Sequence, residues 1–307
     1  MNTIPDIKTL FDYRKARFAD LFAILEQASF NRFLPLNIFF NVDDLILTME
    51  KTPVPLSPYH FASAVLNFAC YFRLFFWNLK IRTNIYFYQN IEDLSINPEL
   101  KEYIKRELDI LSVLCAAIPG VYHIYDYAMP SRIIPFAIDN KSDEVSLVVT
   151  YEHFGLFSPY YSENGKGAML RLAGRNSKVI TSTSLNCKSS LHNILALTGC
   201  PVRKIPNIKR MTYKRAQDFC VNHNLGYSDF KDKTAELLSE TDRKTYLENY
   251  DYFDLRNLIE RYKPNFFSLN SSDKLTDFYG KEELFKIKAE YFSVVPFDIN
   301  QLFLGEE

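Results

Sequence analysis

Short apolar runs alternate with longer amphipathic stretches through the first half of the chain. The first run, Leu36-Asn-Ile-Phe-Phe40, is rich in residue types that favour buried strands. Strands that alternate with helices build a parallel sheet with helices on both faces. We therefore expect an α/β protein whose parallel sheet is covered by helices. The predicted strands are 36–40, 82–88, 121–125, 145–150, 168–172 and 178–182.

Helical patterns fill the intervals between these strands and dominate after about residue 188. Ser57-Pro58 offers an N-cap residue followed by proline at the first helical position, which predicts the start of a long helix. We expect a helical extension over 1–35, an α/β domain over 36–187 and a helical domain over 188–307. The predicted helices are 6–29, 58–79, 98–117, 130–139, 152–161, 188–198, 212–224, 231–239, 252–261 and 281–290.

Segment 59–79 is apolar and about as long as a membrane span. Asn67 and Arg73 interrupt it, and a charged side chain in the middle of a bilayer is strongly unfavourable. A buried core helix is therefore the prediction. The N-terminus lacks the charged-then-apolar pattern of a secretory signal, so we expect a cytoplasmic protein, in a host cell or virion if its source is viral.

Charge and cysteine content restrict the classes of partner. The 307 residues include 36 Lys and Arg against 37 Asp and Glu, a net charge of −1. A chain with so little net charge has no overall electrostatic attraction to nucleic acid, so any contact with nucleic acid requires a local basic patch. The five cysteines have no C-x-x-C spacing, which disfavours a disulfide scaffold and a zinc site.

One local basic patch stands out between residues 203 and 215. Two interpretations of it are open: its side chains contact nucleic-acid phosphates, or they form an ordinary solvated surface. The candidate nucleic-acid-binding residues are Arg203, Lys204, Lys209, Arg210, Lys214 and Arg215.

The same region carries the motif Leu195-Ala-Leu-Thr-Gly-Cys-Pro-Val-Arg-Lys-Ile-Pro-Asn-Ile-Lys-Arg-Met-Thr-Tyr-Lys-Arg-Ala216. It resembles the signature of the 5′-nuclease family (FEN-like, PIN-related) with its carboxylates removed. Cys200, Val202 or Arg203, and Lys204 stand where that family has acidic or Asn residues. The resemblance implies a helical hairpin against a DNA backbone, although Arg210 and Thr212 replace its glycines. The preserved positions are Ala196, Leu197, Gly199, Ile205, Pro206, Ile208, Lys214 and Ala216.

Four further segments resemble the same family, in the same order. Asn41 after the first strand, Gln89 and Asn90 after the second, residues 129–132 and Phe154 stand where that family has metal-ligating carboxylates. The family uses two divalent ions, held by several oxygen ligands, to displace a phosphodiester. The resemblance therefore implies a PIN/FEN-like sheet without catalytic residues, metal or other cofactor. Near these positions, Asp43, Asp44 and Glu152 are the weak remnants of the family's acidic ligand set.

Two histidines are weaker candidates. His123 and His153 lie near the ends of predicted strands, and Glu152 with His153 could exchange protons with a substrate. No matching nucleophile accompanies them, so a structural role is the favoured interpretation.

Three functions follow from these observations. The favoured one is an inactive FEN-like homologue, retained as a nucleic-acid-binding or assembly subunit of a larger complex. The alternatives are an active metal-dependent 5′ nuclease with a remodelled site, and a structural or virion protein that keeps only the fold. The composition, rich in Asn, Lys, Ile, Phe and Tyr, suggests an AT-rich and phage-like source. Segment 6–29, or the tail after 250, is expected to dock a protein partner; duplex or flap DNA is the other candidate partner.

Overall fold

The computed structural model describes the central part of the chain. The described residues are 35–51, 56, 58–116, 118–124, 134–135, 145–160, 167–171, 178–181, 185, 191–200, 203–225 and 230–254. The predicted helices 6–29 and 281–290, residues 129–132 and most of helix 130–139 lie outside these residues.

A six-stranded sheet with the order β3-β2-β1-β4-β5-β6 forms the centre of the described structure. All neighbouring pairs are parallel except β5 and β6, which are antiparallel. In the central register Ile38 lies between Ile85 and Leu147. The predicted α/β fold with a parallel sheet is confirmed, except that the edge strand β6 is antiparallel. The strands are β1 Leu36–Asn41, β2 Thr83–Tyr88, β3 Val121–Ile124, β4 Ser146–Thr150, β5 Gly167–Arg171 and β6 Lys178–Thr181.

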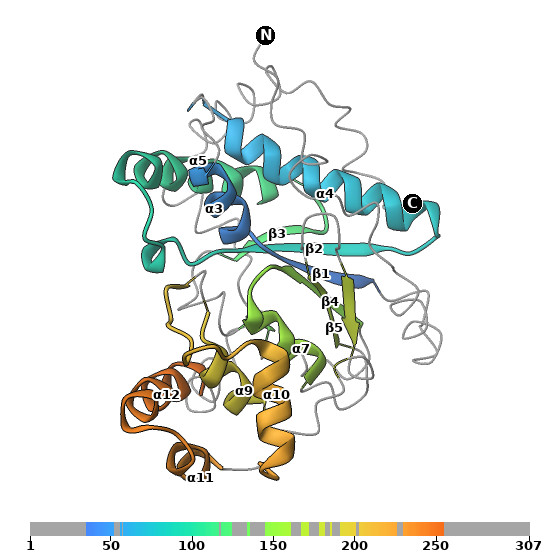
Figure 1. Cartoon of the computed structure of the whole chain (residues 1–307). Coiled ribbons are helices and arrows are strands. Elements are labelled where there is room, and N and C mark those ends of the chain that lie inside the picture. The colour runs from blue at the N-terminus through green and yellow to red at the C-terminus, as the bar shows by residue number, and fades with distance from the viewer. Residues whose placement is uncertain are drawn as a thin grey trace.

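Helices cover both faces of this sheet (Figure 1). One face carries Ile38 and Phe40 and packs against α4 and α5, whereas the other carries Phe39 and Val148 and packs against α7 and α9. Since successive strand residues point to opposite faces, the apolar runs supply both cores. The helices are α3 Asp43–Lys51, α4 His60–Asn78, α5 Pro98–Ala116, α7 Phe157–Tyr160, α9 Leu191–Thr198, α10 Tyr213–Asn222, α11 Lys231–Glu236 and α12 Glu240–Phe253, with 3₁₀ turns η2 Ile91–Asp93 and η4 His153–Leu156.

Helix α4 begins later than the sequence predicted. Its first residue is His60, and Tyr59 before it has φ 64° and makes no side-chain cap. The Glu107 carboxylate on α5 takes that role, since its two oxygens accept hydrogen bonds from the Tyr59 and Ala62 N–H groups at 2.7 and 3.1 Å. The predicted cap residue Ser57 lies outside the described residues, and a buried acid from a distant helix satisfies these donors.

Other boundaries differ in three places. Helix α3 follows β1 directly and was not predicted. The predicted helix 152–161 is a 3₁₀ turn followed by the single turn α7. Helix α12 spans Glu240–Phe253, where no helix was predicted before residue 252, and residues 255–261 of the predicted helix 252–261 lie outside the described residues. Asp and Glu in the first turn, with a Ser239 N-cap, explain the start of α12, and the sequence carried that signal.

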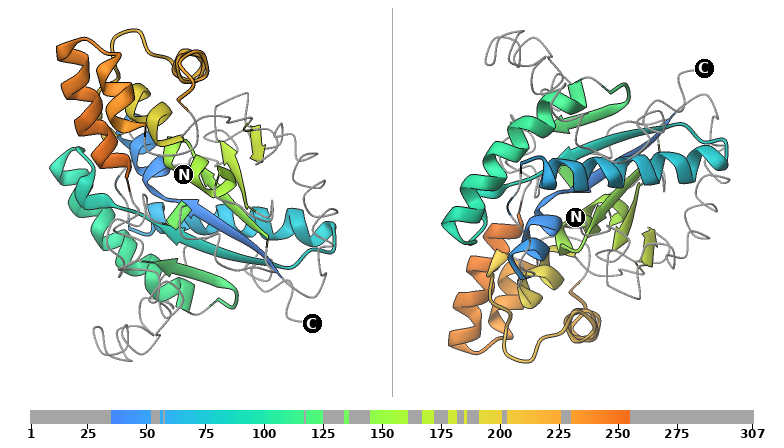
Figure 2. Two further views of the ribbon diagram at one scale, coloured as in Figure 1. Left: turned by 90° about the horizontal axis from the view of Figure 1, so that it is seen from below. Right: turned by 90° about the horizontal axis from the view of Figure 1, so that it is seen from above.

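The C-terminal helices lie beyond the carboxyl end of β1, next to α3 (Figure 2). Ile194, Ala216, Cys220 and Tyr246 of α9, α10 and α12 share one apolar cluster. Helix α9 also belongs to the sheet core through Leu191 and Leu195. Among the described residues no helix is both long and apolar enough to cross a membrane, and α4 is a buried core helix as predicted.

Candidate functional site

Two neighbouring strands, β1 and β4, deliver polar side chains to one edge of the sheet. Asn41 is the last residue of β1, Thr150 the last of β4, and Glu152 follows two residues later. Asn41 Nδ2 donates hydrogen bonds to Glu152 Oε1 at 2.9 Å and to Thr150 Oγ1 at 3.3 Å. The carboxyl ends of parallel strands commonly hold the functional site of an α/β protein. We therefore take this edge as the candidate site.

Two further acids come from the first turn of α3. Both oxygens of Asp43 accept the backbone N–H of Asn90, each at 3.0 Å, and Oδ2 of Asp44 accepts that of Tyr151 at 2.8 Å. Negative charge in the first turn of a helix is favourable because the N–H ends of the peptide dipoles point toward it. These contacts join the segments that follow β1, β2 and β4.

The guanidinium of Arg203 lies among these acids. Arg203 Nη2 is 2.5 Å from Asp43 Oδ2 and 2.7 Å from Glu152 Oε1, and Nε donates to Glu152 Oε2 at 3.1 Å. The exposed fraction of the Arg203 side chain is 1%, and those of the Asp43 and Glu152 side chains are 0%. We call Asp43, Glu152 and Arg203 the buried ion cluster.

A tight turn aims Arg203 into this cluster. Cys200 and Ile205 exchange backbone hydrogen bonds at 3.0 and 3.1 Å, and the N–H of Arg203 donates to the carbonyl of Cys200 at 3.0 Å. Gly199 enters the turn with φ +62°, and a Cβ atom there would lie 2.4 Å from the Pro206 carbonyl oxygen. Asn249 Nδ2 on α12 donates to the Pro206 and Ala196 carbonyls at 2.7 and 2.8 Å. The turn is thus fixed to the helices on both sides.

Burial and charge shift the titration of the cluster. Burial raises the pKa of Asp44 well above its usual range, and the nearby charges of Glu152 and Asp43 raise it further. Burial also raises the pKa of Glu152, against the opposing effect of the Arg203 guanidinium. Burial alone would lower the pKa of Arg203, but Glu152 and Asp43 raise it well above its usual value. Arg203 is therefore a permanent cation.

The carboxylates of this edge do not fit a divalent ion while Arg203 is in place. An ion such as Mg²⁺ needs several oxygen ligands at close, near-octahedral range. The oxygens of Asp43 and Glu152 instead accept hydrogen bonds from Asn90, Asn41 and Arg203. Within the described residues no group of three or more His, Cys, Asp or Glu side chains could hold a metal ion.

Arg203 is not exposed with the rest of the predicted basic patch, because its side chain is buried against the carboxylates. The other five predicted residues are exposed. Arg210 has φ +63°, so it adopts the left-handed backbone conformation usual for glycine at a position where the resembled motif has glycine. Thr212 caps α10 by accepting the N–H of Arg215. The exposed residues, which we call the basic segment, are Lys204, Lys209, Arg210, Lys214 and Arg215.

The two candidate histidines belong to separate networks. His123 is hydrogen-bonded to the Ser112 hydroxyl through Nδ1 and to Gln89 Oε1 through Nε2, the latter at 2.7 Å. Burial lowers the pKa of His123 to about 3, so its ring is neutral.

His153 Nε2 lies 3.5 Å from Arg171 Nη2 rather than against its neighbour Glu152. Burial first, and the charge of Arg171 second, lower the pKa of His153 to about 4. The side chains of Glu152 and His153 contact different partners, so the acid–base pair suggested by the sequence is not formed. Phe154 packs in the core against Phe253, with ring centroids 4.9 Å apart.

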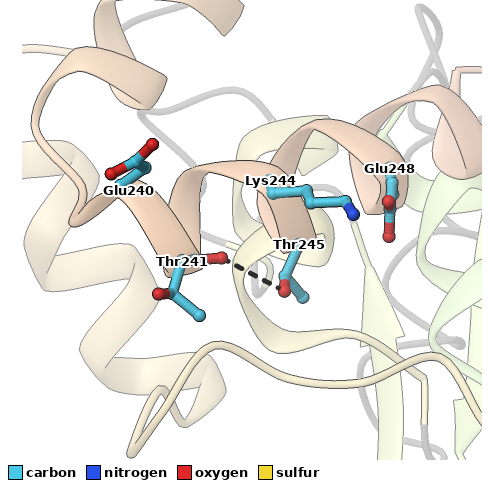
Figure 3. A pocket seen from close by; sticks show the side chains of 5 residues that line it. All are labelled: Glu240, Thr241, Lys244, Thr245 and Glu248. Atoms are coloured by element: carbon cyan, nitrogen blue, oxygen red, sulfur yellow. Dashed lines mark hydrogen bonds between the residues drawn. The ribbon is translucent and has the colours of Figure 1, made fainter.

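A hollow of about 560 Å³ lies along one side of α12 (Figure 3). Figure 3 marks a hydrogen bond from the Thr245 hydroxyl to the Thr241 carbonyl at 3.5 Å, an ordinary contact within a helix. No side chain of the buried ion cluster lines it. Its described lining residues are Glu240, Thr241, Lys244, Thr245 and Glu248.

Sequence reasoning missed the inward direction of Arg203 and the roles of Asn90 and Thr150. One signal was available for Arg203, since it stands in the motif where an acid is expected and other acids follow neighbouring strands. A cation that replaces an acid at such a place can pair with the acids that remain.

No model of a known protein family matches the sequence, and no curated protein matches it. Among solved structures, the chain is similar to zinc-bound 5′-exonuclease of bacteriophage T5, with a TM-score of 0.48 and 11% identity over 84% of this chain and 99% of that one. It is also similar to a variant of the bacteriophage T5 flap endonuclease in a pseudo-enzyme-product complex with DNA and metal ions, with a TM-score of 0.44 and 11% identity over 84% and 99%. A third structure, of the T5 protein co-crystallised with metal ions, has a TM-score of 0.47 and 12% identity over 84% and 99%.

Proposed function

We propose that this chain is a nuclease-fold protein that does not cleave phosphodiesters and serves as a nucleic-acid-binding or assembly subunit of a larger complex. The observation that carries the proposal is the position of Arg203. Its guanidinium occupies the space between Asp43 and Glu152, where the resembled family would require oxygen ligands directed at metal ions.

The basic segment supports the nucleic-acid half of the proposal. Five exposed cations surround the start of α10, a helix of ten residues. Backbone N–H groups at a helix N-terminus and neighbouring Lys and Arg side chains are both suited to phosphate oxygens. A patch of this kind contacts the backbone of nucleic acid and carries no base preference of its own.

A protein partner remains part of the proposal. The segments predicted to dock one, residues 6–29 and most of the tail after 250, lie outside the described residues. The viral origin and the division into domains at residues 35 and 187 likewise remain hypotheses drawn from the sequence.

Binding of a labelled 5′-flap duplex, measured by fluorescence anisotropy across a salt series, tests the nucleic-acid half. We expect binding at low salt, and the logarithm of the binding constant should fall linearly with the logarithm of the salt concentration. The double variant Lys209→Ala/Lys214→Ala should flatten the slope by roughly one unit per lost phosphate contact. The matched control Lys233→Ala/Lys244→Ala removes two exposed cations from α11 and α12 and should leave the slope unchanged.

Incubation of the same flap substrate with wild-type protein and Mg²⁺ or Mn²⁺ tests the proposal that the chain does not cleave phosphodiesters. We expect no product above a protein-free control. Cleavage that disappears in Glu152→Gln would establish the active-nuclease alternative. Absence of binding at low salt, with the protein folded, would instead favour the structural alternative.

A further inference from the structure

We propose that Arg171, the last residue of β5, contacts a nucleic-acid phosphate, so that the nucleic-acid surface extends from the basic segment onto the sheet. The inference deepens the proposed function and rests on its nucleic-acid half. It assigns a phosphate contact to a residue outside the run of cations in 203–215, on a strand rather than on the C-terminal helices.

The position of Arg171 on the sheet is the first support. The parallel register of β4 and β5 places Arg171 beside Thr150, whose hydroxyl accepts a hydrogen bond from Asn41. Successive residues of a strand point to opposite faces, so Arg171 is on the same face as Met169, which packs in the cluster of α7 and α9. Arg171 therefore ends β5 at the edge that holds the candidate site, and it is partly exposed there.

The second support is that no carboxylate of the described residues neutralises Arg171. Its side chain donates one long hydrogen bond, from Nη2 to His153 Nε2 at 3.5 Å. The pKa of His153 is lowered to about 4, so the ring accepts this bond as a neutral group. A guanidinium beside a neutral ring keeps its full charge and most of its donors for an anion, and phosphate matches its planar fork.

The neighbouring strand places a second basic residue at the same register position. Arg171 is directly opposite Lys178, the first residue of β6, in the antiparallel pair of β5 and β6. Like charges directly opposite each other in such a pair are destabilising. An anion bound at this end of β5 offsets that repulsion, whereas a neutral ligand does not.

His153 also connects Arg171 to the basic segment. Its ring centroid lies 6.1 Å from that of Tyr213, the first residue of α10. Tyr213 stands between the cap residue Thr212 and Lys214 of the basic segment. One imidazole and one phenol ring thus separate the guanidinium on β5 from the start of α10. A nucleic-acid strand, with a phosphate about every 3.4 Å along its axis, has phosphates for both positions.

The two arginines at this edge therefore have different roles. Arg203 is enclosed and paired with Asp43 and Glu152, so its charge serves the fold. Arg171 is partly exposed and has no described acid as a partner, so its charge serves a ligand. One strand of nucleic acid would contact β5 and α10 together, and both contacts are to the backbone and carry no base preference.

Anisotropy of the labelled 5′-flap duplex across a salt series tests the proposal on the full chain. Arg171→Met should reduce the slope of the logarithm of the binding constant against the logarithm of the salt concentration by roughly one unit. This loss should add to that of Lys209→Ala/Lys214→Ala. Arg171→Lys keeps the charge and should keep the wild-type slope. The matched control Arg106→Met removes an exposed arginine from α5, on the other face of the sheet, and should leave the slope unchanged.

A wild-type slope in Arg171→Met, with the slope of Lys209→Ala/Lys214→Ala reduced, would overturn this inference and leave the proposed function intact. A slope that Arg171→Lys loses as fully as Arg171→Met would also overturn it, because the charge would then be irrelevant. No binding by folded wild type at low salt would refute both the inference and the nucleic-acid half of the proposed function.

A second measurement on wild-type protein does not depend on the folding of any variant. Phenylglyoxal modifies accessible arginines, and mass spectrometry of the digested protein reports the extent at each one. The flap duplex at low salt should protect Arg171 and leave Arg106 as reactive as in free protein. Equal modification of Arg171 with and without bound duplex would contradict the proposed contact.

Discussion

Arg203 donates two hydrogen bonds to Glu152, from Nε to Oε2 at 3.1 Å and from Nη2 to Oε1 at 2.7 Å, across 51 residues of sequence. The pair is fully enclosed, which makes its charges strongly interdependent. Removal of one member leaves the other buried without compensation, and that situation is far less favourable than removal of both.

A double-mutant cycle measures this dependence. Arg203→Met should lower the free energy of unfolding by about 3–5 kcal/mol, because Asp43 and Glu152 are then buried without a counterion. Arg203→Met combined with Glu152→Gln should be less destabilised than the sum of the two single variants by about 1 kcal/mol or more. Denaturant unfolding of the four proteins supplies the values, and strict additivity would show that the pair is not coupled.

The raised pKa of Asp44 predicts a pH dependence with a definite sign. Because the folded protein keeps a proton that the unfolded chain releases above about pH 4, the free energy of unfolding falls as the pH rises toward the folded pKa. Asp44→Asn removes this contribution. Its free energy of unfolding relative to wild type should therefore improve by on the order of 1 kcal/mol between about pH 5 and about pH 8. Other titrating groups, His123 among them, cancel in the difference, and a flat difference would contradict the prediction.

Gly199 and Lys204 both have positive φ within one turn and should respond oppositely to substitution. Gly199→Ala would bring Cβ against two carbonyl oxygens at 2.4 and 2.5 Å and should destabilise the protein by about 2–4 kcal/mol. Lys204→Gly, where φ is +56°, should be neutral or slightly stabilising. Thermal unfolding of both variants compares them, and equal losses would mean that the turn does not require glycine at its entry.

Glu107 is expected to stabilise the start of α4. Glu107→Gln leaves one oxygen for two backbone donors, so it should lower the free energy of unfolding by about 1–3 kcal/mol. Glu102→Gln is the matched control, since Glu102 is an exposed acid on the same helix and should change stability by less than about 0.5 kcal/mol. Denaturant unfolding measures both, and similar values would show that the helix start needs no cap.

The alternation of apolar and amphipathic segments was enough to predict the sheet. The strands around Phe40 and Val149 are buried on both faces, and their sequences are correspondingly rich in apolar residues. The start of α4 was harder to predict, because the N–H groups of Tyr59 and Ala62 are bound by Glu107, which lies 47 residues after His60 in the sequence. Capping rules consider only residues next to the helix start, so they do not detect such a partner.

The site could be predicted in outline alone. The sequence correctly placed Asn41, Asp43 and Glu152 near strand ends, where chain direction brings them together. It gave Arg203 the same exposed role as Lys209, because both belong to one run of positive charge. Their separation depends on the turn of 200–205, whose direction is set by Gly199 and Asn249 from different segments.

The buried ion cluster also limits how this edge can change over evolutionary time. Loss of Arg203 alone leaves two enclosed acids without a counterion, and gain of another acid adds a third carboxyl group to two that already share one guanidinium. Lineages that accumulate substitutions one at a time meet a less stable intermediate in either direction. Passage between an arginine-filled edge and a carboxylate-rich one therefore requires paired changes, and descendants of this sequence should retain the arginine and the two acids together or replace all three.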